Sequence, residues 1–153
     1  MIYRRSMVRS TLAALGSVTL LARSAAAEAP THGHRLVLHV DQNDAAVMNM
    51  ALGNAGNAAA FYAGRGETVA LELVAYGPGL HMLRADTSPV KARLAEVHKN
   101  LPQMVFSACN NTLQAMQKNE GKEIALVSEA RIVPAGIVRL VQLQEEGWSY
   151  VRV

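Results

Sequence analysis

The chain has 153 residues, of which half are apolar and 18% are charged, and its formal net charge is +3. This length fits one domain with a single core, and the only cysteine, Cys109, excludes a disulfide or a C-x-x-C dithiol within the chain. Four basic and no acidic side chains lie in the first 27 residues, so residues 28–153 carry 11 basic and 12 acidic side chains and give no charge argument for a nucleic-acid partner.

The first 27 residues have the pattern of a secretory signal peptide. A basic start with Arg4, Arg5 and Arg9 is followed by uncharged apolar residues 12–22 and by an A-x-A cleavage pattern that ends at Ala27. The apolar stretch is too short to cross a bilayer of about 30 Å. We therefore predict an exported, periplasmic protein that is cleaved after Ala27 and is not stably inserted in a membrane.

Beyond the signal, residues 28–34 are predicted to form a flexible leader and residues 35–153 one α/β domain. Apolar runs predict five strands, with the last at a sheet edge: 35–40, 67–76, 104–107 with Cys109 at its end, 130–133 and 148–153. Helical spacing and caps predict four helices between them: 45–63, 90–99, 111–118, and one that opens at 134–136 and ends at 145–147. The inward face of the last helix is assigned to Ile137, Leu140, Val141 and Leu143.

Gly53 and Gly56 lower the helical propensity of residues 45–63, which makes sense if another backbone packs close to that face of the helix. Residues 80–83 are predicted to form a short helical turn, and residues 124–127 an irregular segment or a minor strand. Alternation of strands and helices favours an open, mainly parallel five-stranded sheet with helices on both faces. The loops after parallel strands meet at one edge of such a sheet, where ligands bind.

Several polar or small residues gather at that edge. Cys109 comes where a strand ends and a helix begins, so backbone N–H groups and the helix dipole favour its thiolate. A single cysteine in an exported protein indicates a reactive thiol, and the alternative is a small buried side chain. The candidate ligand-binding residues at the same edge are Asp41, Tyr76, Gly77, Gly79, Asn110, Asn111 and Thr112.

His81 is the candidate catalytic partner of Cys109, as its base or as the cation beside its thiolate. It is equally compatible with a plain loop histidine. His39 lies inside a predicted strand and is expected to be a hydrogen-bonded core residue. The sequence has no G-x-G-x-x-G fingerprint after the first strand, no P-loop, no G-x-S-x-G and no cysteine–histidine cluster with zinc spacing, so we predict neither a metal site nor an organic cofactor.

Five segments together resemble the DsrE/DsrF-like family, specifically its exported single-domain branch. The segments are residues 38–41, 76–83, 106–112, 133–136 and 147–148. The resemblance implies a five-stranded parallel α/β domain that assembles as a homotrimer or homohexamer. It also implies that Cys109 matches the cysteine that carries sulfur as a persulfide in the sulfur-relay members of the family.

The leading hypothesis is therefore a sulfur carrier, at most sulfurtransferase-like, that takes sulfane sulfur on Cys109 from a donor and passes it to an acceptor. Its partners would be sulfur donor and acceptor proteins or small sulfur compounds. An alternative is a non-catalytic oligomeric module that binds a small ligand or a redox partner, with Cys109 lining its pocket. A third is a thiol-dependent hydrolase or transferase that uses His81.

Overall fold

A computed structural model describes residues 33–153, and the predicted signal peptide lies outside these residues. The described residues form five strands, four α-helices and one 3₁₀ helix. In chain order they are β1 (His34–Val40), α1 (Ala45–Ala63), β2 (Val69–Ala75), η1 (Gly77–Leu83), α2 (Lys91–Asn100), β3 (Val105–Cys109), α3 (Asn110–Glu120), β4 (Ala130–Val133), α4 (Gly136–Glu145) and β5 (Ser149–Arg152).

All five strands are parallel, in the order β4-β3-β2-β1-β5. Sheets of this kind join neighbouring strands through crossover helices, which is what the alternating apolar runs and helical patterns predict. The predicted α/β fold class is thus confirmed, and β5 lies at a sheet edge as predicted.

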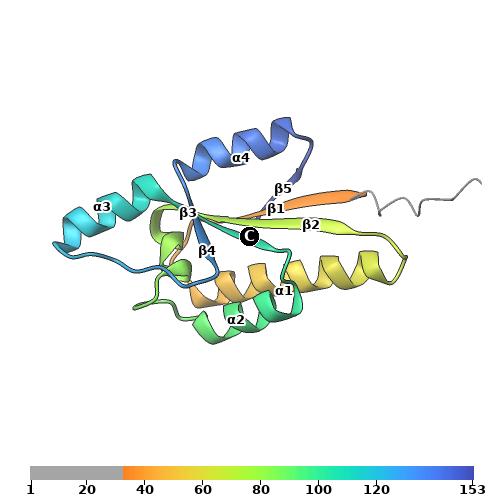
Figure 1. Cartoon of the computed structure of the whole chain (residues 1–153), viewed down its shortest axis with the longest axis horizontal. Coiled ribbons are helices and arrows are strands. Elements are labelled where there is room, and N and C mark those ends of the chain that lie inside the picture. Colours follow the sequence, from red (N-terminus) through yellow and green to blue (C-terminus); the bar gives the residue numbers. More distant parts are fainter. Residues whose placement is uncertain (1–32) are drawn as a thin grey trace, which may run out of the picture.

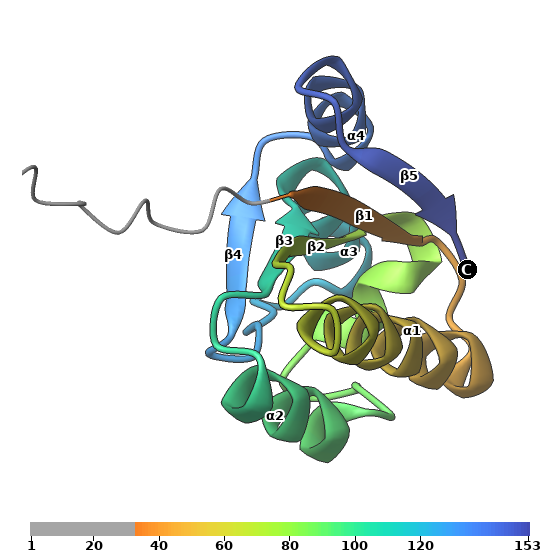
Figure 2. The ribbon, with the colours of Figure 1, turned by 90° about the vertical axis from the view of Figure 1, so that its right-hand side faces the viewer.

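The two faces of the sheet are covered unequally (Figures 1 and 2). Helices α1 and α2 cover one face, α4 alone covers the other, and α3 projects beyond the carboxyl ends of the strands. The larger core lies on the α1 and α2 side and includes Leu38, Leu73 and Phe106. The core beneath α4 is a small cluster of Val37, Val74, Leu140 and Leu143.

Local signals account for several element boundaries. The side chain of Asp44 accepts hydrogen bonds from the backbone N–H groups of Ala46 (2.7 Å) and Val47 (3.2 Å), so it caps the N-terminus of α1. Gly121 ends α3 in the left-handed conformation. Leu126 makes an isolated antiparallel bridge with Arg84, so the segment around it is irregular, as predicted.

Buried Arg84 fixes the carboxyl end of η1 against α3. Its guanidinium donates hydrogen bonds to the carboxylates of Asp86 and Glu120. These bonds hold the pKa values of both carboxyl groups well below their ordinary values. The ion pair of Arg84 and Glu120 tethers α3 even though that helix lies beyond the edge of the sheet.

Three predictions on the elements are wrong. His34 belongs to β1 and stacks on Tyr62, with ring centroids 3.8 Å apart, so it is not part of a flexible leader. Ile137 and Val141 do not face inward, because they are 58% and 46% exposed and only Leu140 and Leu143 are buried beneath α4. Their apolar spacing is real, but within residues 33–153 no second helix covers the outer side of α4.

The surroundings of the α1 glycines also differ from the prediction. Gly53 and Gly56 break helical propensity, which suggested that another backbone packs close to them. A Cβ atom at either position would meet nothing within 4 Å.

Within residues 33–153, no helix has both the length and the apolar character needed to cross a bilayer.

Candidate functional site

Cys109 occupies the junction that its sequence context predicts. It is the last residue of β3, it directly precedes the first turn of α3, and its thiol is free. The residue is only 5% exposed. The Cys109 side chain therefore lies at the carboxyl edge of the sheet but is almost completely enclosed.

Polar groups surround the sulfur of Cys109. Burial acts to raise the pKa of this thiol, but hydrogen bonds from the Thr112 hydroxyl and from the backbone N–H groups of Gly136, Thr112 and Asn111 outweigh it, so the pKa lies below its ordinary value. The Asn111 N–H is shared with the Pro134 carbonyl, at 3.4 Å. These donors all favour the thiolate over the thiol.

Two helix N-termini converge on this sulfur. Asn111 and Thr112 belong to the first turn of α3, and Gly136 is the first residue of α4. Each helix presents unsatisfied N–H groups and the positive end of its dipole at its N-terminus. An anion at Cys109 is thus stabilised from two directions, by elements that are neighbours only in the folded chain.

Gly136 makes this convergence possible. A Cβ atom at position 136 would lie 2.8 Å from Cδ1 and 2.9 Å from Cβ of Tyr76, and 3.2 Å from Cβ of Cys109. Any side chain there would push the start of α4 away from β3. The glycine is required for close approach of the backbone.

The loop after β2 supports the same site. The backbone N–H of Gly77, whose φ is +52°, donates to the Thr112 hydroxyl at 3.0 Å. Gly79 sits against the end of β1, since a Cβ atom there would lie 2.3 Å from the Val40 carbonyl oxygen. Of the predicted residues, Gly77 therefore positions Thr112 and Tyr76 packs against the start of α4 beside Cys109, whereas Gly79 anchors the loop on the end of β1.

A second polar cluster lies beside Tyr76, and its members Asp41, Tyr76 and His39 were named from the sequence, but Tyr150 and Arg152 were missed. The His39 ring stacks on Tyr76 with centroids 4.6 Å apart, and its Nδ1 is 2.8 Å from the Tyr150 hydroxyl. Arg152 donates to the Asp41 carboxylate at 2.8 Å. Among the described residues, Nε2 of His39 and Oδ1 of Asp41 are buried without a hydrogen-bond partner.

Burial decides the charge states in this cluster. It lowers the pKa of His39, although Asp41 acts in the opposite direction, so the imidazole is neutral at pH 7. Burial also raises the pKa of Tyr76, and Asp41 adds to the effect. The pair of His39 and Tyr150 is separated by 111 residues, so no local sequence signal could have found it.

His81 lies in η1, and its Nδ1 is 2.8 Å from the Thr87 hydroxyl. It lines a shallow cavity of about 540 Å³ together with Asn111 and Thr112, and Cys109 does not line that cavity. The groups around the Cys109 sulfur are backbone N–H groups and a hydroxyl, and the role of His81 as a catalytic partner stays a prediction. Asn110 begins α3 directly after Cys109.

Across residues 33–153, no three histidine, cysteine, aspartate or glutamate side chains converge as metal ligands would. What the arrangement offers chemically is a single stabilised thiolate. Such a group suits nucleophilic attack on sulfur, and because its pKa is lowered it also leaves more readily than an ordinary thiolate.

No protein-family model and no curated sequence matches this chain. A solved structure does: the protein of unknown function MTH1491 from Methanobacterium thermoautotrophicum superposes with a TM-score of 0.66 at 31% sequence identity. The alignment covers 78% of this chain and 99% of that protein.

Proposed function

Because this chain belongs to the same family as MTH1491 of Methanobacterium thermoautotrophicum, a protein whose function is itself unknown, we propose a function from the site alone. We propose that the protein carries sulfane sulfur as a persulfide on Cys109. The resemblance to the DsrE/DsrF-like family is consistent with this chemistry. The observation that carries the proposal is the pair of helix N-termini directed at one thiol whose pKa is lowered despite burial.

Loading would begin with attack of the Cys109 thiolate on the outer sulfur of a persulfide or polysulfide. A new S–S bond forms to Cys109, the S–S bond of the donor breaks, and the donor leaves as a thiolate that takes up a proton from water. No net oxidant or reductant is needed, because the sulfane sulfur moves between thiols. The Thr112 hydroxyl and the surrounding N–H groups would hold the attacking sulfur as an anion.

Unloading would run the same exchange in the opposite direction. An acceptor thiolate attacks the outer sulfur of the Cys109 persulfide, and the Cys109 thiolate leaves. A leaving thiolate departs faster when its pKa is low. The groups that favour loading therefore favour release as well, which suits a carrier better than a permanent store.

The test is intact-mass spectrometry of the protein, purified without reductant, before and after incubation with polysulfide. We expect the mass of wild type to rise by one or more sulfur atoms and to return to its starting value with reductant, while Cys109→Ser gains nothing. Wild type that gains no sulfur would reject the carrier function.

One observation favours the alternative, a non-catalytic binding module. Cys109 is only 5% exposed, so a large donor protein cannot reach its sulfur without rearrangement. A binder would keep its ligand in Cys109→Ser, whereas a carrier would lose all sulfur uptake. Small polysulfide anions are the donors that suit an enclosed thiol.

We also propose an exported protein that assembles as a homotrimer or homohexamer. The outer side of α4 supports assembly, because it exposes Ile137, Val138 and Val141 side by side on one helix. We expect Val141→Asp to lower the mass in solution, measured by light scattering, because a charge in an apolar contact is costly. Phe61→Asp, at an exposed position of α1, is the matched control, and equal behaviour of both variants would count against this interface.

A further inference from the structure

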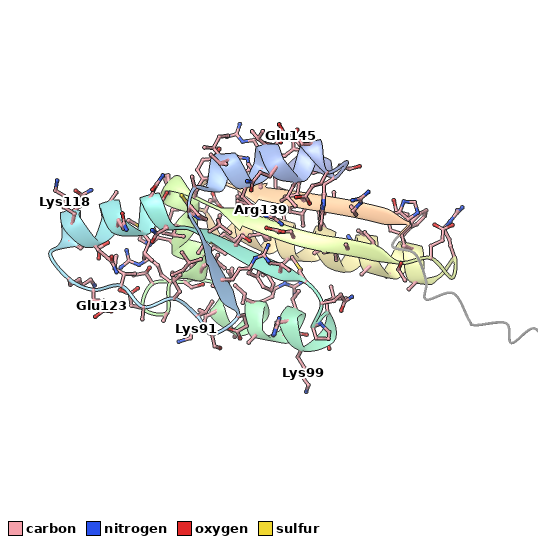
Figure 3. All side chains as sticks on the ribbon, turned by 45° about the horizontal axis from the view of Figure 1, so that its top comes forward. Lys91, Lys99, Lys118, Glu123, Arg139 and Glu145 are labelled. Carbon is pink, nitrogen blue, oxygen red and sulfur yellow. The ribbon has the colours of Figure 1, made fainter. Side chains whose placement is uncertain are left out.

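A buried carboxylate lies beneath α4, and two arginines converge on it. Glu72 of β2 is 1% exposed and accepts hydrogen bonds from Nε (2.8 Å) and Nη2 (2.7 Å) of Arg139. Nη2 of Arg131 lies 2.9 Å from the same carboxylate, and the Ser107 hydroxyl donates to it at 2.6 Å. Figure 3 labels Arg139 where α4 faces the sheet.

The two arginines are neutralised unequally. Two guanidinium groups meet one carboxylate, and the Nη1 group of each arginine makes no hydrogen bond among the described residues. The nearest further carboxylate is that of Glu146, whose oxygen is 3.9 Å from Nη1 of Arg139. Arg131 shares the Glu72 carboxylate with Arg139 and has no second carboxylate among the described residues, so its guanidinium is the one available to a further anion. Guanidinium forks suit carboxylates and other oxyanions.

A cavity of about 350 Å³ opens beside these two guanidiniums. Arg131, Arg139 and Gln142 supply its polar lining, and Val133 and Val138 are among its apolar walls. A cavity with charged donors at one side and apolar walls elsewhere fits a small organic anion better than a bare inorganic ion.

The cavity adjoins the Cys109 site. In the register of the sheet, Arg131 pairs with Ser107 and Val133 pairs with Cys109, so the thiol lies one strand away from the cavity floor. The cavity wall continues through Pro134 and Ala135, the two residues before Gly136, whose N–H faces the sulfur. Cys109 is not itself part of the cavity lining: its strand neighbour Val133 is ~4.8 Å away across the sheet, and Arg131 lies two residues, or ~6.6 Å, further back along β4. An extended small molecule held at Arg131 can span that separation.

We propose that Arg131 and Arg139 bind the carboxylate of a small anionic thiol that exchanges sulfur with Cys109. This rests on the proposed carrier function and names the class of its small partner. The thiolate of that molecule attacks the outer sulfur of the Cys109 persulfide, a new S–S bond forms on the small molecule, and Cys109 leaves as its thiolate. The arginines bind and orient the carboxylate, and they take no part in the exchange itself.

The binding test uses Cys109→Ser, which cannot exchange sulfur, with two probes that differ in charge. Mercaptoacetate carries a carboxylate, and mercaptoethanol is its uncharged counterpart. We expect mercaptoacetate to bind at least tenfold more tightly by calorimetry, and Arg131→Gln in the same background to remove this preference. Arg131→Lys, which keeps the charge but not the fork, should retain part of it.

The kinetic test uses wild type loaded with polysulfide and measures the rate at which each probe removes the persulfide. The two thiols differ in intrinsic reactivity, so we compare ratios. The rate with mercaptoacetate is divided by the rate with mercaptoethanol, and this ratio in wild type is divided by the same ratio in Arg131→Gln. We expect this quotient to be about 10. Arg93→Gln, on exposed α2 across the sheet, is the matched control and should leave the ratio unchanged.

Folding of the variants is checked by thermal unfolding, and Arg131 is the residue to change because its side chain is 49% exposed. Equal binding of both probes would overturn the anion site. Charge-selective binding by a wild type that takes up no sulfur would reject the sulfur exchange and the carrier function but keep the anion site. If Arg131→Gln dissociates the assembly while mercaptoacetate and mercaptoethanol bind equally, this surface is a subunit contact and the proposal is overturned.

Discussion

Thr112 links the two loops that form the thiol site. Its hydroxyl accepts a hydrogen bond from the Gly77 N–H and donates one to the Cys109 sulfur. Because the Thr112 oxygen accepts the Gly77 N–H, the hydroxyl is held in an orientation that directs its proton at the Cys109 sulfur. At the residue scale, Thr112 is therefore the side chain on which the charge state of Cys109 depends most directly.

We predict that Thr112→Val raises the pKa of the Cys109 thiol by about 1, because a hydrogen bond to a charged group contributes about 1.5–3 kcal/mol and one pKa unit corresponds to about 1.4 kcal/mol. The measurement is the absorbance of the thiolate as a function of pH. Thr112→Ser keeps the hydroxyl and should behave like wild type. An unchanged pKa in the valine variant would mean that the backbone N–H groups alone stabilise the anion.

The direction of the pH dependence follows from the same contacts. Because the folded-state pKa of Cys109 lies below its ordinary value, the thiolate predominates above that lower folded-state pKa, and the stability that its contacts add is complete above the ordinary value. Both are lost as the pH falls through the folded-state pKa. Alkylation of Cys109 should therefore slow with acidification at a lower pH than alkylation of a peptide thiol.

At the scale of elements, two helices respond in opposite ways to the same substitution. Gly136 of α4 has no room for a methyl group, whereas Gly53 of α1 has nothing within 4 Å of a Cβ atom. We predict that Gly136→Ala destabilises the fold by about 1–3 kcal/mol through overpacking. Gly53→Ala, the control, should stabilise it by up to about 1 kcal/mol through helix propensity.

Urea denaturation measures both changes, and the thiol titration adds a second readout for Gly136→Ala. We expect its Cys109 pKa to rise, because the N–H of residue 136 moves away from the sulfur. If both alanine variants were equally stable, the close approach of α4 to β3 would not be a constraint on the fold.

Elements whose signals are local were predictable from the sequence. Helix α1 was predicted with its observed limits of Ala45–Ala63, because its apolar spacing lies within the segment and its capping signal directly precedes it. The inward face of α4 was predicted wrongly at Ile137 and Val141. Which apolar residues of a helix are buried depends on how many helices share a face of the sheet, and the α4 segment does not encode that number.

The same reasoning applies to the site. The position of Cys109 between a strand and a helix follows from neighbouring residues, and the glycine at 136 lies in a segment that the sequence placed at the same edge. The ion pair of Glu72 and Arg139 joins residues 67 positions apart. Each of its partners looks like an ordinary charged residue along the chain, and only the strand register and the placement of α4 bring them together.

At the scale of the whole molecule, Glu72 joins four elements. It lies on β2 and binds groups from β3, β4 and α4. Burial alone would raise the pKa of its carboxyl group, but the hydrogen bonds from Arg139, Ser107 and Arg131 lower it. This carboxylate therefore stabilises the fold above its unfolded-state pKa of about 4.3, and the stabilisation is lost as the pH falls through the lower folded-state pKa.

We predict that Glu72→Gln lowers the free energy of unfolding by about 3 kcal/mol at neutral pH, since it leaves the two guanidiniums without their carboxylate. The variant should also lose stability less steeply than wild type on acidification. Urea denaturation over a range of pH measures both effects, with exposed Glu96→Gln as control. A variant with the acid sensitivity of wild type would show that Glu72 does not govern it.

Because the core beneath α4 is small, local unfolding of α4 affects both the exposure and the charge state of Cys109. Within residues 33–153, four buried apolar residues with partly buried Tyr76 and Trp148 form the core on that face, against a much larger core on the other side. Apart from this small core, the contact of Arg139 with Glu72 holds α4, so we expect α4 to detach before the helices of the larger core. Its departure would uncover Cys109 and, in the same motion, withdraw the Gly136 N–H that favours the thiolate. The exposure of the Cys109 sulfur thus rises while its nucleophilicity falls. Thermal fluctuations that expose the sulfur to bulk oxidants also return it toward the less reactive thiol, and the folded state keeps its most reactive form enclosed.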